Sequence, residues 1–179
     1  MREREAVGVD PGATSVPRLG REVPEVDPTG RDYAVLALGP AARPVAAAWA
    51  RRIEESGATS WVSYAPALSD GVIAAFRERL AVASVGWRLM LCGPEHEVLR
   101  LRGEAVLAGA LPAEIRMHAT ADGHRRVYCA HCRHVTSGDI AVGELLVCGG
   151  CGLTLVCYHH FSRRLAAYLA YQADAEAIA

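Results

Sequence analysis

The sequence has 179 residues, of which 51% are hydrophobic and 22% charged, enough for one ordinary domain and a small module, so the chain is not of the disordered class. All 19 basic residues are arginine, which excludes Schiff-base catalysis and P-loop phosphate binding, because both need a lysine ε-amine. The formal net charge of −1 leaves no overall positive field to recruit nucleic acid or an anionic membrane. No apolar run approaches the roughly 18–20 residues that span a bilayer, and the charged start lacks a secretory core, so we expect a cytoplasmic protein.

The first segment of the chain has no periodic pattern. Residues 1–31 contain four prolines, several glycines and scattered charges. We therefore predict an extended tail over residues 1–31, a small α/β domain over 32–122, and a zinc ribbon with a C-terminal helix over 123–179.

Short apolar runs alternate with helical patterns in the middle of the chain. The apolar runs, which predict buried strands, are residues 33–38, 61–64, 87–92 and 115–118. Apolar residues at helical spacing predict helices over residues 45–55, 69–80 and 95–109, the second capped by Ser69 or Asp70. This alternation predicts an α/β fold with a small, mainly parallel sheet of three to four strands. A ligand would bind beyond the carboxyl ends of the strands.

Two glycine–proline turns follow predicted strands and open predicted helices, at residues 38–44 and 92–96. Together they resemble the nicotinamide-binding half of ferredoxin-reductase-type flavoproteins, over residues 33–118. The first turn has Ala41 and Arg43 where those reductases have glycine, no complete GxGxxG occurs, and one strand–helix unit is missing. The sequence therefore favours a truncated scaffold that has lost its nucleotide. If a cofactor is retained, the candidate residues are Gly39, Arg43, Cys92, Gly93 and His96.

The second turn contains two chemically reactive residues. A thiol at a helix N-terminus, such as Cys92, can have a lowered pKa and react, although packing is the favoured explanation. His96 can serve as an acid or base, but no second catalytic group is identifiable beside it, which favours a solvated histidine at a helix start. We therefore assign no catalytic residue.

Four of the six cysteines form two CxxC pairs, separated by residues 133–147. This spacing is typical of a zinc ribbon, in which four thiolates complete a tetrahedral, structural site. Residues 127–128, 145–147 and 153–156 predict its strands, residues 137–139 and 142–144 its turns, and Cys157 lies in a strand. His131 and His134 are then surface residues. A pair of disulfides and an iron site are the alternatives. The predicted metal ligands are Cys129, Cys132, Cys148 and Cys151.

The segment after the second CxxC pair, residues 160–168, has the sequence HFSRRLAAY. Directly after a ribbon, it resembles the DmmA-like family, the small subunit of bacterial dimethylamine monooxygenase. The resemblance implies a non-catalytic or accessory, zinc-binding subunit of a multi-component enzyme that oxidises dimethylamine to methylamine and formaldehyde with O₂ and reduced pyridine nucleotide. It also implies oxygenase and reductase subunits as partners, which would hold any haem, flavin or iron–sulfur centre, and an inactive isolated chain.

We expect this closing segment to bind the oxygenase partner. Ser162 can cap a helix whose first turn holds two arginines, an unfavourable place for positive charge that partner carboxylates would explain. The alternative is a helix folded back on the protein with solvated arginines. The predicted interface residues are His160, Phe161, Arg163, Arg164 and Tyr168.

Two other functions remain open from the sequence. The first is a stand-alone reductase-like protein that binds flavin or NAD(P) at the two turns. The second is a zinc-ribbon adaptor that binds nucleic acid, supported only by scattered arginines and opposed by the net charge. We expect neither nucleic acid nor a membrane as partner. The arginines in question are residues 125, 126, 133, 163 and 164.

Overall fold

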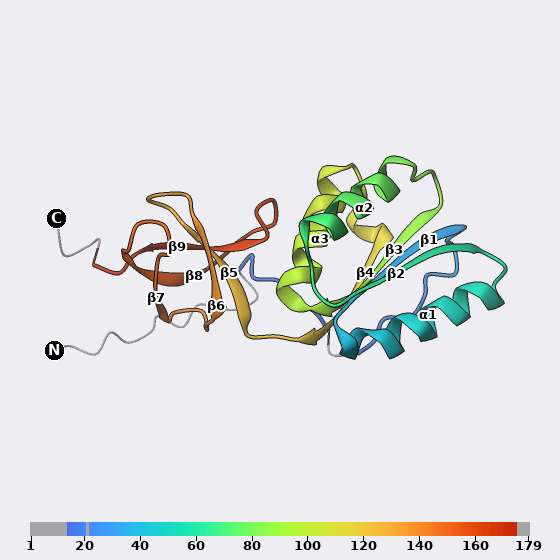
Figure 1. Cartoon of the computed structure of the whole chain (residues 1–179), viewed down its shortest axis with the longest axis horizontal. Coiled ribbons are helices and arrows are strands. Elements are labelled where there is room, and N and C mark those ends of the chain that lie inside the picture. The colour runs from blue at the N-terminus through green and yellow to red at the C-terminus, as the bar shows by residue number, and fades with distance from the viewer. Residues whose placement is uncertain (1–13, 21, 175–179) are drawn as a thin grey trace. The chain divides into compact units, whose positions relative to one another are not determined.

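The computed structural model describes residues 14–20 and 22–174, which form two compact units (Figure 1). The α/β unit consists of Leu19–His124 and the turn Arg163–Ala166. The ribbon unit consists of Arg125–Ser162 and the described parts of residues 1–18 and 167–179. Among the described residues, no helix has the length and apolar character needed to cross a membrane.

The α/β unit is built on a four-stranded parallel sheet, which confirms the predicted fold class. Its strand order is β2-β1-β3-β4, so the crossover from β2 to β3 passes over β1. Each pair of successive strands is joined by one α-helix, as the alternating pattern predicts, and short 3₁₀ helices at Pro40–Ala42 and Pro112–Glu114 extend two of these connections. The elements are β1 (Asp32–Leu38), α1 (Arg43–Glu55), β2 (Thr59–Ala65), α2 (Asp70–Ala81), β3 (Trp87–Pro94), α3 (Glu95–Leu107) and β4 (Ile115–Ala121).

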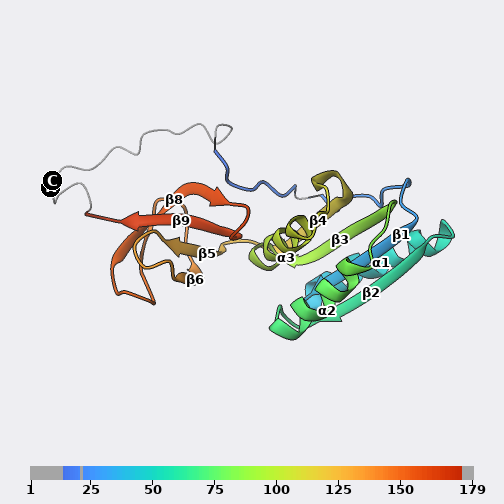
Figure 2. The same cartoon turned by 90° about the horizontal axis from the view of Figure 1, so that it is seen from above.

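The core of this unit lies on both faces of β1, in which every residue from Tyr33 to Leu38 is buried. Helix α1 covers one face of the sheet, and α2 and α3 cover the other (Figures 1 and 2). Successive side chains of a strand point to opposite faces, so β1 contributes to two separate clusters. One cluster joins Ala34, Leu36 and Leu38 to Phe76, Leu80, Val98 and Leu101, and the other joins Tyr33, Val35 and Ala37 to Ala46, Trp49 and Ile53.

The segment before β1 packs against the α/β unit. The indole Nε1 of Trp49 donates a hydrogen bond to the Pro24 carbonyl oxygen at 2.9 Å. Asp27 accepts from the backbone N–H of Thr29 at 2.9 Å and from Nε of Arg88 at 2.8 Å. Donation from Thr29 and Arg88 holds the pKa of the Asp27 carboxyl well below its usual range. Residues 22–31 are thus held by charged and backbone contacts, whereas residues 1–13 of the predicted tail lie outside the described residues.

The ribbon unit contains a five-stranded sheet of order β6-β5-β9-β8-β7. Strands β7 and β9 each pair with β8 in antiparallel orientation, whereas β5 and β9 are parallel, with Val127 opposite Tyr168. The strand predicted around residues 127–128 is therefore paired with the end of the described chain. The strands are β5 (His124–Cys129), β6 (Val135–Asp139), β7 (Leu145–Val147), β8 (Thr154–Ser162) and β9 (Ala167–Gln172).

The predicted C-terminal helix is wrong, because the segment is a β-hairpin whose turn is Arg163–Ala166. Phe161 lies opposite Tyr168 across the two strands, and their rings are 5.2 Å apart in an edge-to-face arrangement. This cross-strand pair is buried and outweighs the local helical spacing of the sequence. The turn predicted at residues 137–139 is also wrong, because these residues lie in β6.

Candidate metal centre

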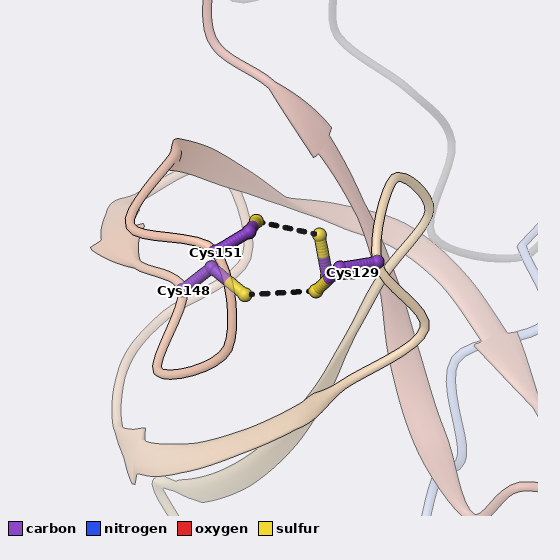
Figure 3. Close-up of side chains that lie close together, drawn as sticks. Cys129, Cys148 and Cys151 are labelled. Carbon is purple, nitrogen blue, oxygen red and sulfur yellow. Dashed lines mark hydrogen bonds between the residues drawn. The ribbon is translucent and has the colours of Figure 1, made fainter.

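The four cysteines of the two CxxC pairs converge at one point of the ribbon unit. Their sulfur atoms all lie within 4.8 Å of one another. Two loops face each other across this point, one after β5 and one after β7 (Figure 3). The Sγ atoms of Cys129 and Cys151 are 3.8 Å apart, and those of Cys132 and Cys148 are 3.5 Å apart. The structure therefore brings together all four predicted ligands.

The two cysteine loops have the same backbone hydrogen bonds. In the first, Cys129 N–H donates to the His134 carbonyl and Arg133 N–H donates to the Cys129 carbonyl, both at 2.9 Å. In the second, Cys148 donates to Leu153 and Gly152 donates to Cys148, again at 2.9 Å. The fifth residue of each loop has positive φ, 66° at Arg133 and 73° at Gly152. Each loop is thus a tight turn that presents two sulfur atoms on one side.

The glycines of the second loop allow the first loop to approach closely. A methyl group at Gly150 would lie 2.6 Å from Cβ of His134 and 3.1 Å from Sγ of Cys132. Gly149 donates its N–H to the hydroxyl of Thr136 at 3.0 Å. His134 is exposed, as predicted for a surface residue, and packs on this loop. The spacing of the thiols therefore depends on the absence of a side chain at Gly150.

The protonation of the thiols is strongly uneven. Burial opposes ionisation of Cys148, but backbone N–H groups of Cys151 and Gly150 donate to its sulfur and lower its pKa to about 6. The pKa of Cys151 is raised to about 12, because burial and the neighbouring sulfur atoms outweigh the N–H of Leu153. Ionisation of one thiol is favoured, whereas ionisation of the thiols beside it is disfavoured by repulsion. A divalent cation would offset this repulsion and allow several thiolates to lie together.

The donor set fits a tetrahedral metal ion. With Zn–S bonds of about 2.3 Å, tetrahedral geometry separates neighbouring sulfur atoms by about 3.8 Å, close to the separations of 3.5 and 3.8 Å found here. The alternative of two disulfides is not realised, because all six cysteines are free and an S–S bond is about 2.05 Å long. Four thiolates also suit iron, so the donor set does not by itself select zinc.

The two glycine–proline turns lie side by side at the carboxyl ends of β1 and β3, which are neighbours in the sheet. Gly39 has a φ of 79°, and its N–H donates to the Ala65 carbonyl at 2.9 Å. A methyl group at Gly93, whose φ is 157°, would lie 2.8 Å from Cβ of Leu38. Gly93 is therefore required for close packing of the two turns, a role that does not depend on a bound phosphate.

The remaining residues of these turns also make internal contacts. Cys92 is fully buried, and burial raises the pKa of its thiol to about 11, so the favoured packing explanation agrees with the structure and a reactive thiolate does not. The guanidinium carbon of Arg43 lies 5.4 Å from the ring centroid of Tyr64. The rings of His96 and His124 are 4.6 Å apart, so the helix-start histidine does have a neighbour.

Two surface cavities of the α/β unit, of about 450 and 410 Å³, lie away from these turns. The first is lined by residues of the segment before β1 and by α1, including Trp49. The second is lined by the ends of α2 and α3, including Trp87. Neither cavity includes a candidate cofactor residue from the two turns.

The predicted interface residues fall into a buried group and an exposed group. Phe161 and Tyr168, predicted as interface residues, are 5% and 4% exposed and are core residues of the ribbon unit. Tyr168 packs between Phe161 and Arg125, whose guanidinium carbon is 5.4 Å from its ring. His160, Arg163 and Arg164 are exposed.

Two charged residues of α3 are partly buried, although nothing in the sequence predicts it. One carboxylate oxygen of Glu97 accepts from the N–H of Leu68 at 3.0 Å, and the other is buried without a hydrogen-bond partner among the described residues. Arg102 lies in the same helix and is partly buried. An acidic or basic residue within a helix has no local signal that marks it as buried.

Part of the ribbon unit is similar to a described family. Residues 126–171 match the family described as dimethylamine monooxygenase subunit DmmA-like, C-terminal domain. Over 94 residues the chain is 43% identical to the haem-dependent oxidative N-demethylase delta subunit of Ectopseudomonas mendocina (strain ymp), covering 52% of this chain and 53% of that protein. The chain thus spans about half the length of this curated relative. A phthalate dioxygenase reductase structure matches with a TM-score of 0.42 and 10% identity, over 65% of this chain and 47% of that one. The four-cysteine cluster lies within the segment that is similar to the DmmA-like C-terminal domain.

Proposed function

We propose that this chain is an accessory, zinc-binding subunit of an oxidative N-demethylase complex. The complex would convert dimethylamine, O₂, NAD(P)H and a proton to methylamine, formaldehyde, NAD(P)⁺ and water. The observation that carries the proposal is the four-thiol cluster inside the matched family domain. The relative, which is named as the delta subunit of a haem-dependent demethylase, supports the reaction class and the existence of further subunits.

The zinc would be structural. Four thiolates leave no open position for water or substrate, which catalytic zinc requires. The ribbon sheet is small, so a metal that ties its two cysteine loops together would contribute a large part of its folding free energy. Reduced thiols are typical of the cytoplasm, where we place the protein.

We assign the haem, flavin or iron–sulfur centres to the partner subunits, an oxygenase and a reductase component. The packing roles of Cys92 and Gly93 support this assignment. In the turn that a nucleotide would contact, Cys92 is buried and Gly93 packs against Leu38. The chain would then contribute binding and assembly, and the reacting atoms would lie on other subunits.

The test is co-expression of the affinity-tagged chain with its neighbouring genes, followed by purification, metal analysis and absorption spectroscopy. We expect one zinc per chain, a co-purifying subunit with haem absorbance, and dimethylamine-dependent NAD(P)H oxidation by the complex only. The isolated chain should be colourless and inactive. Turnover or flavin absorbance in the isolated chain would contradict the proposal, and so would the absence of any haem-containing partner.

A further inference from the structure

Helix α3 packs against the turn Arg163–Ala166, which belongs to the α/β unit. The contact lies at Gly103, whose backbone faces the turn. A methyl group there would lie 3.4 Å from the Arg163 carbonyl oxygen and 3.9 Å from Cβ of Ala166. Arg102 precedes Gly103 in α3 and lies near enough to Arg163 for the two positive charges to repel each other.

These two guanidinium groups have no counter-ion in the described part of the chain. The side chains of Arg102 and Arg163 form no ion pair or hydrogen bond there, and the side chain of Arg164 in the same turn forms none either. Other arginines of the same unit are paired with carboxylates, which shows that the unit can supply such partners. These pairs are Arg77 with Glu104, Arg79 with Asp32, and Arg88 with Asp27.

The unpaired arrangement is unfavourable for the free chain. Burial and the charge of Arg163 lower the pKa of Arg102, so the charged state of this side chain is disfavoured where it lies. Two adjacent cations that lack an internal anion are stabilised by an external one. A carboxylate suits them, because a guanidinium group donates two parallel hydrogen bonds to its oxygens.

We propose that Arg102 and Arg163 form a binding site for a carboxylate side chain of another subunit, an inference that rests on the proposed function. Arg163 is exposed and Arg102 half-buried, so an approaching glutamate or aspartate can reach both. Binding would remove the repulsion between the two cations and desolvate the contact. The sequence alone predicts an interface at Arg163 and Arg164 of the turn. The structure adds Arg102 of α3 as the second residue of the proposed carboxylate site.

The first experiment measures assembly with the co-expressed partner. The double variant Arg102→Gln with Arg163→Gln should weaken the affinity for the partner by about 10- to 100-fold. Arg51→Gln is the matched control, because Arg51 is an exposed arginine of α1 with no ion pair in the described structure. Unchanged affinity in the double variant overturns the site but leaves the proposed function intact. Failure of the wild-type chain to assemble overturns the proposed function.

The second experiment uses the isolated chain and inorganic phosphate as an anionic probe, at constant ionic strength. Phosphate should raise the Tm of the wild type and of Arg51→Gln, and should raise that of the double variant less. Without phosphate, the double variant should melt at the same temperature as the wild type or higher, because a repulsion has been removed. Equal phosphate effects in all three proteins overturn the inference, and a lower Tm of the double variant without phosphate does so too, since it would show a structural role.

Discussion

Replacing Gly150 by alanine tests whether close packing of the two cysteine loops sets the spacing of the four thiols. The added methyl group would lie 2.6 Å from Cβ and 2.8 Å from Cγ of His134. Cβ of His134 is attached to the backbone and cannot rotate away, so the first loop must move. Such a movement separates Cys132 from Cys148, whose sulfur atoms are 3.5 Å apart. Gly150 has no positive φ, so alanine causes no backbone strain.

The expected cost follows from overpacking a closely packed contact, about 1–3 kcal/mol. Without metal the loops can separate at little cost, so the clash acts mainly on the metal-bound state. Zinc affinity should therefore fall by about 5- to 150-fold, since 1.4 kcal/mol corresponds to a factor of ten. The assay is a competition titration of zinc against a chromophoric chelator.

Gly149→Ala is the matched control for this variant. Its methyl group would lie 3.4 and 3.8 Å from Nε2 and Cδ2 of His134 and 3.6 Å from the hydroxyl of Thr136, all in parts of side chains that can move. We expect a change in zinc affinity of about twofold or less.

Removing the opposing atom should restore binding. In the double variant Gly150→Ala with His134→Gly, the space vacated by the His134 side chain accepts the new methyl group, so the two effects should not be additive. If Gly150→Ala binds zinc as tightly as the wild type, or if His134→Gly gives no rescue, loop packing does not determine the site.

Three further outcomes test other parts of the molecule. Cys132→Ser should abolish zinc binding and unfold the ribbon unit while the α/β unit stays folded, as metal analysis and NMR would show. Asp27→Ala should destabilise the α/β unit by about 2–3 kcal/mol in urea unfolding, because it leaves a partly buried arginine unpaired. Because the pKa of Asp27 is lowered in the folded state, its contribution is present above about pH 4 and is lost as the pH falls below that value. Gly93→Ala should lower the Tm without any added ligand, because its methyl group would clash with Leu38; an unchanged Tm would contradict the packing role.

Local signals were sufficient to predict the α/β unit. Ser69 caps α2 as predicted, accepting a hydrogen bond from the N–H of Val72 at 3.3 Å. The uninterrupted apolar run of β1 corresponds to a strand buried on both faces. The two CxxC pairs also predicted the thiol cluster, because each pair forms its own tight loop.

Contacts between distant residues could not be predicted in the same way. The closing segment has helical spacing at Leu165, Tyr168 and Leu169, yet its conformation is decided by pairing with β8 and with β5, which lies about forty residues earlier. The proposed site at Arg102 also depends on a contact between residues that are distant in the sequence. Nothing within α3 indicates that a turn sixty residues later lies against Gly103.

The position of β9 between β5 and β8 has a consequence for synthesis on the ribosome. All four thiols have been made once Cys151 is added, but the strand that joins the two halves of the sheet is made afterwards. The nascent chain can therefore bind its metal before the sheet is complete, while the α/β strands, all made earlier, already pair. If the cluster binds zinc, as proposed, loading of the metal would precede pairing of β9 with β5 and β8.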